Sequence, residues 1–243
     1  MSLGISDIKP QIEKLDWDSD FFKIKIGELT LTKIEDLENL ELNSEFDLVY
    51  VNSNFNIGEL ENVSYGGTKV DYKKELKLNE IESYRTTAII NVDSNYFSKY
   101  EKDLSELAYL SGHQSRFYQD PLFKESDFRK LYDKWLENAL NKTNDNVFLV
   151  YHDELINKPV ALLTGRVNKV DFNIKVGLFA VHESQQGKGL GKNLLNAFEQ
   201  LGKTSNCNII TIATQKENLG ACRFYEASGY QASQAQFIYH FWK

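Results

Sequence analysis

A glycine-rich stretch that joins an apolar segment to an amphipathic one constrains this chain more than any other feature. Residues 176–192 read VGLFAVHESQQGKGLGK, and apolar side chains follow at helical spacing: Leu190, Leu194, Leu195, Phe198 and Leu201. The pattern predicts a buried strand, a short polar turn and a glycine loop that opens a helix. Such a loop presents backbone N–H groups with the helix dipole behind them, and its glycines place no Cβ where an anion must touch backbone. We therefore expect a diphosphate ligand.

Two common diphosphate-binding motifs do not fit this loop. A P-loop needs Ser or Thr after its Gly-Lys pair, but Asn193 follows Gly191 and Lys192. A dinucleotide fingerprint needs an acidic residue at the end of the next strand, and residues 208–214 end without one. A plain glycine-softened turn between a strand and a helix remains the alternative interpretation.

The spacing Gln186-x-x-Gly189-x-Gly191 resembles the coenzyme A pyrophosphate loop of the GNAT acetyltransferase superfamily. The resemblance implies that acetyl-CoA is the co-substrate. It also implies a set of cofactor-binding residues: Phe179, Ala180, Val181, Gln186, Gly187, Lys188, Gly189, Leu190, Gly191, Asn218 and Tyr225.

A second motif follows the loop at the distance that the superfamily implies. Residues 208–214 are apolar on both faces, as a central strand should be, and Asn218 stands where a helix N-cap belongs. Tyr225 lies seven residues further on, two helical turns away, so it shares a face with Asn218. The resemblance implies that Asn218 contacts coenzyme A and that Tyr225 is the catalytic acid that protonates the departing thiolate. A core aromatic is the alternative for Tyr225.

Two further roles in acetyl transfer depend on the strand before the loop. In the superfamily a backbone N–H on this strand stabilises the thioester oxygen, which points here to Ala180 or Val181. No residue stands out as the base that deprotonates the amine, because residues 172–181 carry no carboxylate and His182 and Glu183 lie just past them.

The order of predicted elements gives the fold class. Two helices (residues 100–113 and 125–142) precede three antiparallel strands, and helix, strand, helix and strand follow. We therefore expect an α/β (α+β) GNAT fold, with a mixed, mostly antiparallel central sheet flanked by helices, in residues 93–243. Residues 1–92 form a smaller, strand-rich N-terminal domain in this prediction, in which Trp17, Phe21 and Phe22 anchor the first strand.

Short matches to one GNAT group bear on the acceptor. Residues 15–22, 114–117, 132–139, 213–218 and 223–229 resemble segments of the TDP-fucosamine acetyltransferase family, which acts on TDP-4-amino-4,6-dideoxy-D-galactose. The resemblance implies a nucleotide-linked, TDP-type amino sugar as the substrate and polysaccharide biosynthesis as the setting. Ser115 and Arg116 are the substrate-binding candidates, since Arg can hold a phosphate with two hydrogen bonds; a surface charge or ion pair is the alternative for Arg116. Another small amine, a peptide N-terminus, or a non-catalytic acyl-CoA-binding module are the alternative functions.

Composition excludes several other classes of protein. The chain has 243 residues and a net charge of −7, which argues against nucleic acid as a partner. The mean hydropathy is −0.45 with no membrane-length apolar run, and two cysteines favour a reducing, cytoplasmic location. The four histidines are scattered, so we expect no metal site. A homodimer through the aromatic last strand, residues 236–242, is left open.

Overall fold

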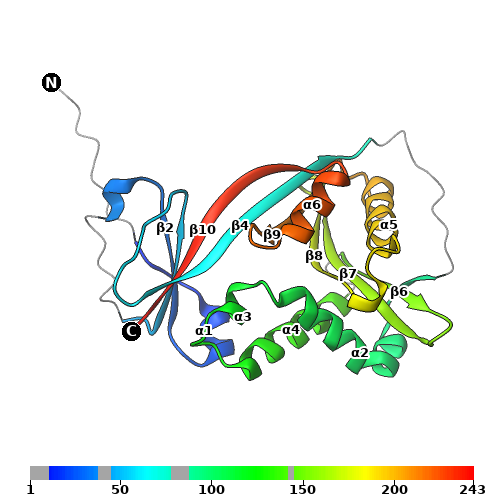
Figure 1. The fold of residues 1–243 in the computed structure, drawn as a ribbon, viewed down its shortest axis with the longest axis horizontal. Coiled ribbons are helices and arrows are strands. Elements are labelled where there is room, and N and C mark those ends of the chain that lie inside the picture. The colour runs from blue at the N-terminus through cyan, green and yellow to red at the C-terminus, as the bar shows by residue number, and fades with distance from the viewer. Residues whose placement is uncertain (1–10, 38–44, 78–87, 142–144) are drawn as a thin grey trace. The chain divides into compact units, whose positions relative to one another are not determined.

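The computed structural model describes residues 11–37, 45–77, 88–141 and 145–243 (Figure 1). Contacts within the chain divide it into two compact units. The first unit comprises Met1–Lys69, Gln215–Glu217 and Ala235–Lys243, and the second comprises Val70–Thr214 and Asn218–Gln234. Neither unit is one continuous segment. The sequence division into residues 1–92 and 93–243 stays a prediction, and it differs from these units chiefly because residues 70–92 fall in the second one.

The first unit is a small sheet with short helices. Its elements are β1 (Glu13–Lys14), α1 (Asp16–Phe22), β2 (Ile26–Leu31), the 3-10 helix η1 (Ile34–Leu37), β3 (Leu48–Ser53), the start of β4 (Val63–Glu75) and the end of β10 (Gln231–Trp242). Strand β2 pairs with β1 antiparallel and with β3 parallel, and β10 pairs antiparallel with β3. The core of this unit contains Leu29, Leu31, Val49, Val51 and Tyr239.

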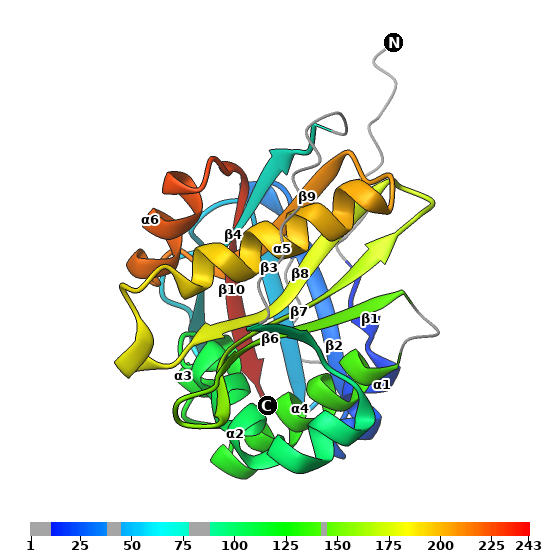
Figure 2. The same ribbon diagram turned by 90° about the vertical axis from the view of Figure 1, so that its right-hand side faces the viewer.

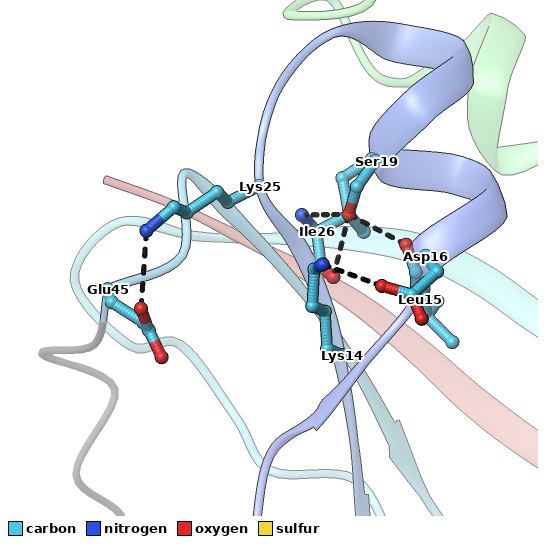
Figure 3. A network of polar contacts seen from close by, with 7 residues as sticks. All are labelled: Lys14, Leu15, Asp16, Ser19, Lys25, Ile26 and Glu45. Atoms are coloured by element: carbon cyan, nitrogen blue, oxygen red, sulfur yellow. Dashed lines mark hydrogen bonds and ion pairs between the residues drawn. The ribbon is translucent and has the colours of Figure 1, made fainter.

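Helix α1 precedes β2 near the N-terminus. It carries Trp17, Phe21 and Phe22, which were expected to anchor the first strand, and it contacts β2. The ring of Trp17 stacks on that of Phe21 at 5.0 Å, since residues four apart share a helical face. Figure 3 shows how Ser19 joins the helix to β2: its hydroxyl donates to the Leu15 carbonyl at 2.7 Å and accepts the Ile26 N–H at 2.9 Å.

The second unit contains the mixed sheet and the long helices. Its elements, besides parts of β4 and β10, are β5 (Ile89–Asn91), α2 (Ser94–Gly112), α3 (Arg116–Gln119), α4 (Glu125–Leu140), β6 (Asn146–Asp153), β7 (Lys158–Asn168), β8 (Asn173–Val181), η3 (Glu183–Gln185), α5 (Leu190–Thr204), β9 (Ile209–Gln215) and α6 (Leu219–Ala227). The strand order is β4-β9-β8-β7-β6-β5. Strands β5 to β8 pair antiparallel, and β8 pairs parallel with β9. This arrangement confirms the predicted mixed, mostly antiparallel sheet flanked by helices.

Helices cover both faces of the second unit's sheet. Helix α5 lies across one face, and α2 and α4 lie on the other (Figures 1 and 2). The apolar stripe of α5 is buried through Leu194, Leu195 and Phe198. A Cβ on Gly165 of β7 would lie 2.3 Å from Phe198 Cζ, so this glycine is what lets α5 approach the sheet.

Strand β4 adds N-terminal residues to the sheet of the second unit. It lies next to β9, and the N–H of Leu76, just past its end, donates to the Asn208 carbonyl at 2.8 Å. Val70, Tyr72 and Leu76 are buried in the same core as the α5 residues. The sheet of the second unit is therefore not built from residues 93–243 alone.

Candidate active site

The two parallel strands at the centre of the second unit separate along their length. Among residues 173–215, all of which the structure describes, β8 and β9 pair only from Asn173 with Ile209 to Lys175 with Thr211. Beyond that point β8 is irregular, since its register against β7 shifts between Leu163 and Gly165, and the Leu178 N–H donates to Thr164 Oγ1 at 2.8 Å. Such a bulge bends a strand and increases its twist. The result is an opening between β8 and β9.

A cavity of about 650 Å³ occupies this region. Its walls come from the end of α2, from β8, from the glycine loop with the start of α5, and from α6. They include every predicted cofactor-binding residue except Lys188: Phe179, Ala180, Val181, Gln186, Gly187, Gly189, Leu190, Gly191, Asn218 and Tyr225. The fold thus brings these residues, which are up to 46 positions apart in the chain, to one cavity.

The glycine loop exposes backbone N–H groups to that cavity. Gly187 and Gly189 have φ of +75° and +81°, a region that favours glycine, and no heavy atom lies within 4 Å of a Cβ built on either. Gly189 is the N-cap of α5, and the first helical bond runs from the Asn193 N–H to the Gly189 carbonyl at 3.0 Å. The N–H groups of residues 190–192 therefore have no partner one turn back. The loop and helix N-terminus fit a diphosphate, and the Lys192 side chain lies on the same wall.

Strand β8 directs one backbone N–H away from β7. The His182 N–H donates to the Val160 carbonyl at 2.8 Å, and Ala161 faces Val181 in the register. Because hydrogen-bonded and non-bonded pairs alternate in an antiparallel ladder, Val181 belongs to a non-bonded pair. Its N–H and carbonyl point away from β7, and Gln186 Nε2 donates to that carbonyl at 3.1 Å. Between the two residues considered from the sequence, the geometry favours Val181 over Ala180 as the donor facing the opening.

Helix α6 presents Asn218 and Tyr225 to the cavity. Asn218 is the N-cap, as expected, and its Oδ1 accepts the Ala221 N–H at 3.1 Å, which leaves its amide nitrogen available. Tyr225 is 5% exposed and packs against the rings of Phe179 and Phe224, with centroids 6.5 and 5.5 Å away. Burial first, and then the neighbouring Cys222 and Tyr72, raise the pKa of Tyr225 above its ordinary value. Its phenol is therefore protonated at neutral pH.

The end of α2 lines the cavity with residues that sequence reasoning did not single out. They are Leu110, Ser111, His113 and Gln114, and Gly220, Ala221 and Phe224 of α6 line the cavity as well. Gln114 does fall in a segment that resembles the TDP-fucosamine group, which was the available signal. Leu110, Ser111 and His113 have no local pattern, because only packing of α2 against β8 brings them near the loop.

The two substrate-binding candidates lie beside this wall and do not line the cavity. Ser115 is 9% exposed and precedes the short helix α3, and the Arg116 guanidinium lies over the ring of Phe117 at 4.8 Å. Their role stays a prediction. His182 accepts the Ser184 N–H at 3.3 Å and so caps η3, and the base for the amine remains unassigned.

The described residues were also compared with the requirements of a metal site and of a membrane-spanning helix. Across residues 11–37, 45–77, 88–141 and 145–243 there is no group of three or more His, Cys, Asp or Glu side chains arranged to hold a metal ion. Within these ranges, every helix is too short or too polar to cross a membrane.

Comparison with known proteins identifies the family. Residues 108–230 match the model of the acetyltransferase (GNAT) family. The spore coat polysaccharide biosynthesis protein SpsD of Bacillus subtilis (strain 168) is 29% identical over 140 residues, which are 57% of this chain and 46% of that protein, so the match spans about half of the relative.

Solved structures show the same fold. A conserved protein of unknown function from Staphylococcus epidermidis ATCC 12228 aligns over 100% of this chain and 98% of its own, with a TM-score of 0.61 and 18% identity. A putative GNAT acetyltransferase from Novosphingobium aromaticivorans DSM 12444 aligns over 81% of this chain and 75% of its own, with a TM-score of 0.52 and 11% identity. Because residues 108–230 match the family model, and the chain has the separated strands and the glycine loop described above, it belongs to the GNAT acetyltransferase family.

Proposed function

We propose that this protein is an acetyl-CoA-dependent N-acetyltransferase that acts on the amino group of a TDP-linked amino-deoxy sugar. The observation that carries the reaction class is the opening between β8 and β9, which ends at the glycine loop and holds Tyr225 in its wall. Family membership supports acetyl-CoA as the acyl donor.

Each part of the cavity has a role in this reaction. Backbone N–H groups of the glycine loop and α5 bind the diphosphate of the donor. The Val181 N–H donates to the thioester oxygen as it gains negative charge. The amine nitrogen forms a bond to the acetyl carbon, the carbon–sulfur bond breaks, and Tyr225 gives its proton to the sulfur. The amine loses its own proton to water or to a base that the structure leaves unassigned.

The proposed acceptor rests on resemblance to two kinds of known protein. Segments on both sides of the cavity, such as residues 114–117 and 213–218, resemble the TDP-fucosamine acetyltransferase family, and SpsD is named for polysaccharide biosynthesis. An amino sugar also suits an active site without an evident base, because such amines have a lower pKa than lysine. A cytoplasmic location fits the two free thiols, Cys207 and Cys222.

The test measures thiol release from acetyl-CoA with three groups of acceptors: TDP-4-amino-4,6-dideoxyhexoses, free amino sugars and simple amines. Rapid release with a TDP-amino sugar alone is the expected result. Tyr225→Phe should lower kcat at least about tenfold, or about 1.4 kcal/mol of barrier, without changing acetyl-CoA affinity. Tyr100→Phe is the matched control, since it removes a buried hydroxyl that bonds Asn157 and does not line the cavity.

Three outcomes separate the parts of the proposal. Turnover of amines that lack a nucleotide, with no preference for TDP, would replace the acceptor while keeping the reaction. Equal kcat for the native protein and Tyr225→Phe would remove Tyr225 as the acid. Binding of acetyl-CoA without turnover of any acceptor would leave a coenzyme A-binding module.

A further inference from the structure

We infer that Tyr72, on a strand that precedes the family-matched segment, is a positioning residue for Tyr225. The inference rests on the proposed function, since it concerns the residue proposed as the acid. Tyr72 lies on β4 and residue 108 begins the GNAT match, so nothing in the matched segment points to it. All the residues concerned, from β4 and α6, lie in the second unit.

Tyr72 packs directly against the proposed acid. The side chain of Tyr72 is 3% exposed, and its ring centroid lies 5.7 Å from that of Tyr225 with the planes tilted by 55°. Tilted aromatic pairs at this separation attract each other. The contact fixes one side of the Tyr225 ring, while Phe179 and Phe224 lie against it as part of the cavity wall.

The hydroxyl of Tyr72 reaches two other residues of helix α6. It donates to Glu226 Oε1 at 3.1 Å, and the Cys222 side chain lies close enough to influence its pKa. Cys222 is three residues before Tyr225 and Glu226 is one residue after it, so these contacts hold the helical turn that carries the acid. Burial first, then Cys222 and Glu226, raise the pKa of the Tyr72 phenol, which keeps it protonated and able to donate.

These contacts tie the orientation of α6 to strand β4. Helix α6 has nine residues, Leu219–Ala227, and it packs against the core through Ala221, Cys222, Phe224 and Tyr225. The contacts of Tyr72 add to this packing from the side of β4. Asn218 and Tyr225 both face the cavity only when the rotation of α6 about its own axis is fixed. A small displacement of a proton donor is costly, because proton transfer needs hydrogen-bond distance. Tyr72 therefore acts on turnover through Tyr225 and touches no reacting atom.

The experiment compares Tyr72→Phe with Tyr230→Phe. Tyr230 is also 3% exposed, and its hydroxyl also donates to a glutamate, Glu199, at 2.9 Å, but that partner lies on α5. We expect Tyr72→Phe to lower kcat about tenfold with unchanged KM for acetyl-CoA. Tyr230→Phe should lower thermal stability by as much as Tyr72→Phe does, but its kcat should stay within about twofold of the native value. Rates are measured as thiol release with TDP-4-amino-4,6-dideoxy-D-galactose, or as acceptor-independent hydrolysis of acetyl-CoA where that acceptor gives no turnover.

The double variant Tyr72→Phe/Tyr225→Phe distinguishes positioning from a general structural effect. If Tyr72 acts through Tyr225, the double variant should be no slower than Tyr225→Phe alone, because the acid is already absent. Multiplying effects in the double variant, or an unchanged kcat in Tyr72→Phe, would overturn the inference. Since Tyr225→Phe is measured separately, its own lack of effect would overturn the proposed acid and with it the role of Tyr72.

Discussion

At the scale of single residues, two glycines of this chain allow backbone strain and ligand contact to be separated. Gly189 in the loop and Gly58 in the first unit have φ of +81° and +74°, and a Cβ on either would meet no atom within 4 Å. An alanine therefore suffers the same conformational strain at both positions. Only Gly189 lines the cavity that we assign to acetyl-CoA.

We predict that Gly189→Ala weakens acetyl-CoA binding at least about tenfold, because the added methyl would stand where the diphosphate approaches the backbone. Gly58→Ala should cost a similar amount of stability, about 1 kcal/mol, and leave the affinity unchanged. Isothermal titration calorimetry with acetyl-CoA and thermal unfolding of both variants provide the measurements. Equal affinity in the two variants would contradict the assignment of the loop.

Sequence reasoning identified half of the residues that line the cavity, because its motifs are local. The glycine loop and the Asn218–Tyr225 pair each lie within ten residues, so spacing alone places their members on one loop or one helical face. Leu110 and His113 were not identified, because they depend on how α2 lies against β8. No local pattern links Tyr72 to Tyr225, and only the pairing of a distant strand brings the two together.

At the scale of elements, α2 is held against α4 by contacts that also place the cavity wall. The hydroxyls of Ser105 and Tyr109 donate to the Asp133 carboxylate at 2.8 and 2.7 Å. Further along α2, Gly112 lies under the ring of Tyr132, where a Cβ would be 2.3 Å from Cζ. The close approach at Gly112 thus fixes the end of α2, which supplies residues 110–114 to the cavity and its neighbourhood.

We predict that Gly112→Ala destabilises the protein by about 1–3 kcal/mol, since the methyl would collide with a buried ring. Urea unfolding measures the loss. Adding Tyr132→Leu to Gly112→Ala should recover part of it, because the shorter side chain leaves room for the methyl. An unchanged urea midpoint in the single variant would show that α2 and α4 separate at little cost.

Strand β4 is the element that local patterns could not place. Its alternating exposure has the period of a strand, but nothing nearby in the sequence says that it lies beside β9. Long-range pairing of this kind depends on the whole sheet. The long helices and the strands from residue 94 onward were predictable because each has its own periodicity. The four-residue helix α3, strand β4 and the boundaries of the two units were not.

We predict that a fragment of residues 93–243 does not fold cooperatively. It lacks Val70, Tyr72 and Leu76 from the core and exposes the edge of β9, which favours aggregation. A fragment of residues 61–243 retains β4 and is the control. Circular dichroism and urea unfolding should show a cooperative transition for the longer fragment only; a cooperative transition in both would contradict the role of β4.

At the scale of the whole molecule, several buried tyrosines link stability to alkaline pH. Burial is the first cause that raises the pKa of Tyr72, Tyr225 and Tyr230, and it raises the pKa of Tyr132 to about 12. In the unfolded chain a tyrosine has a pKa of about 10. Above that pH the unfolded state releases protons that the folded state keeps, so the free energy of unfolding decreases as pH rises.

We predict that these tyrosines leave the free energy of unfolding constant from pH 8 to pH 9, because they titrate in neither state there. Between about pH 10 and 12 the free energy of unfolding should decrease steeply. Tyr132→Phe should make that decrease shallower by up to about 1.4 kcal/mol per pH unit, because one group no longer titrates. Urea unfolding at a series of pH values tests this. Identical slopes for the native protein and the variant would show that Tyr132 titrates alike in both states.

The interleaving of the two units has a consequence for the order in which the chain can fold during synthesis. Strand β3 pairs with β10 through Phe237–Trp242, and these residues leave the ribosome only after the entire second unit has been made. The first unit, although it begins the chain, cannot be completed until then. Its strands β2 and β3 must wait with one edge unpaired, a state in which strands are prone to join other chains. We therefore expect the edge of β3 that pairs with β10 to stay unpaired while residues 70–234 are translated.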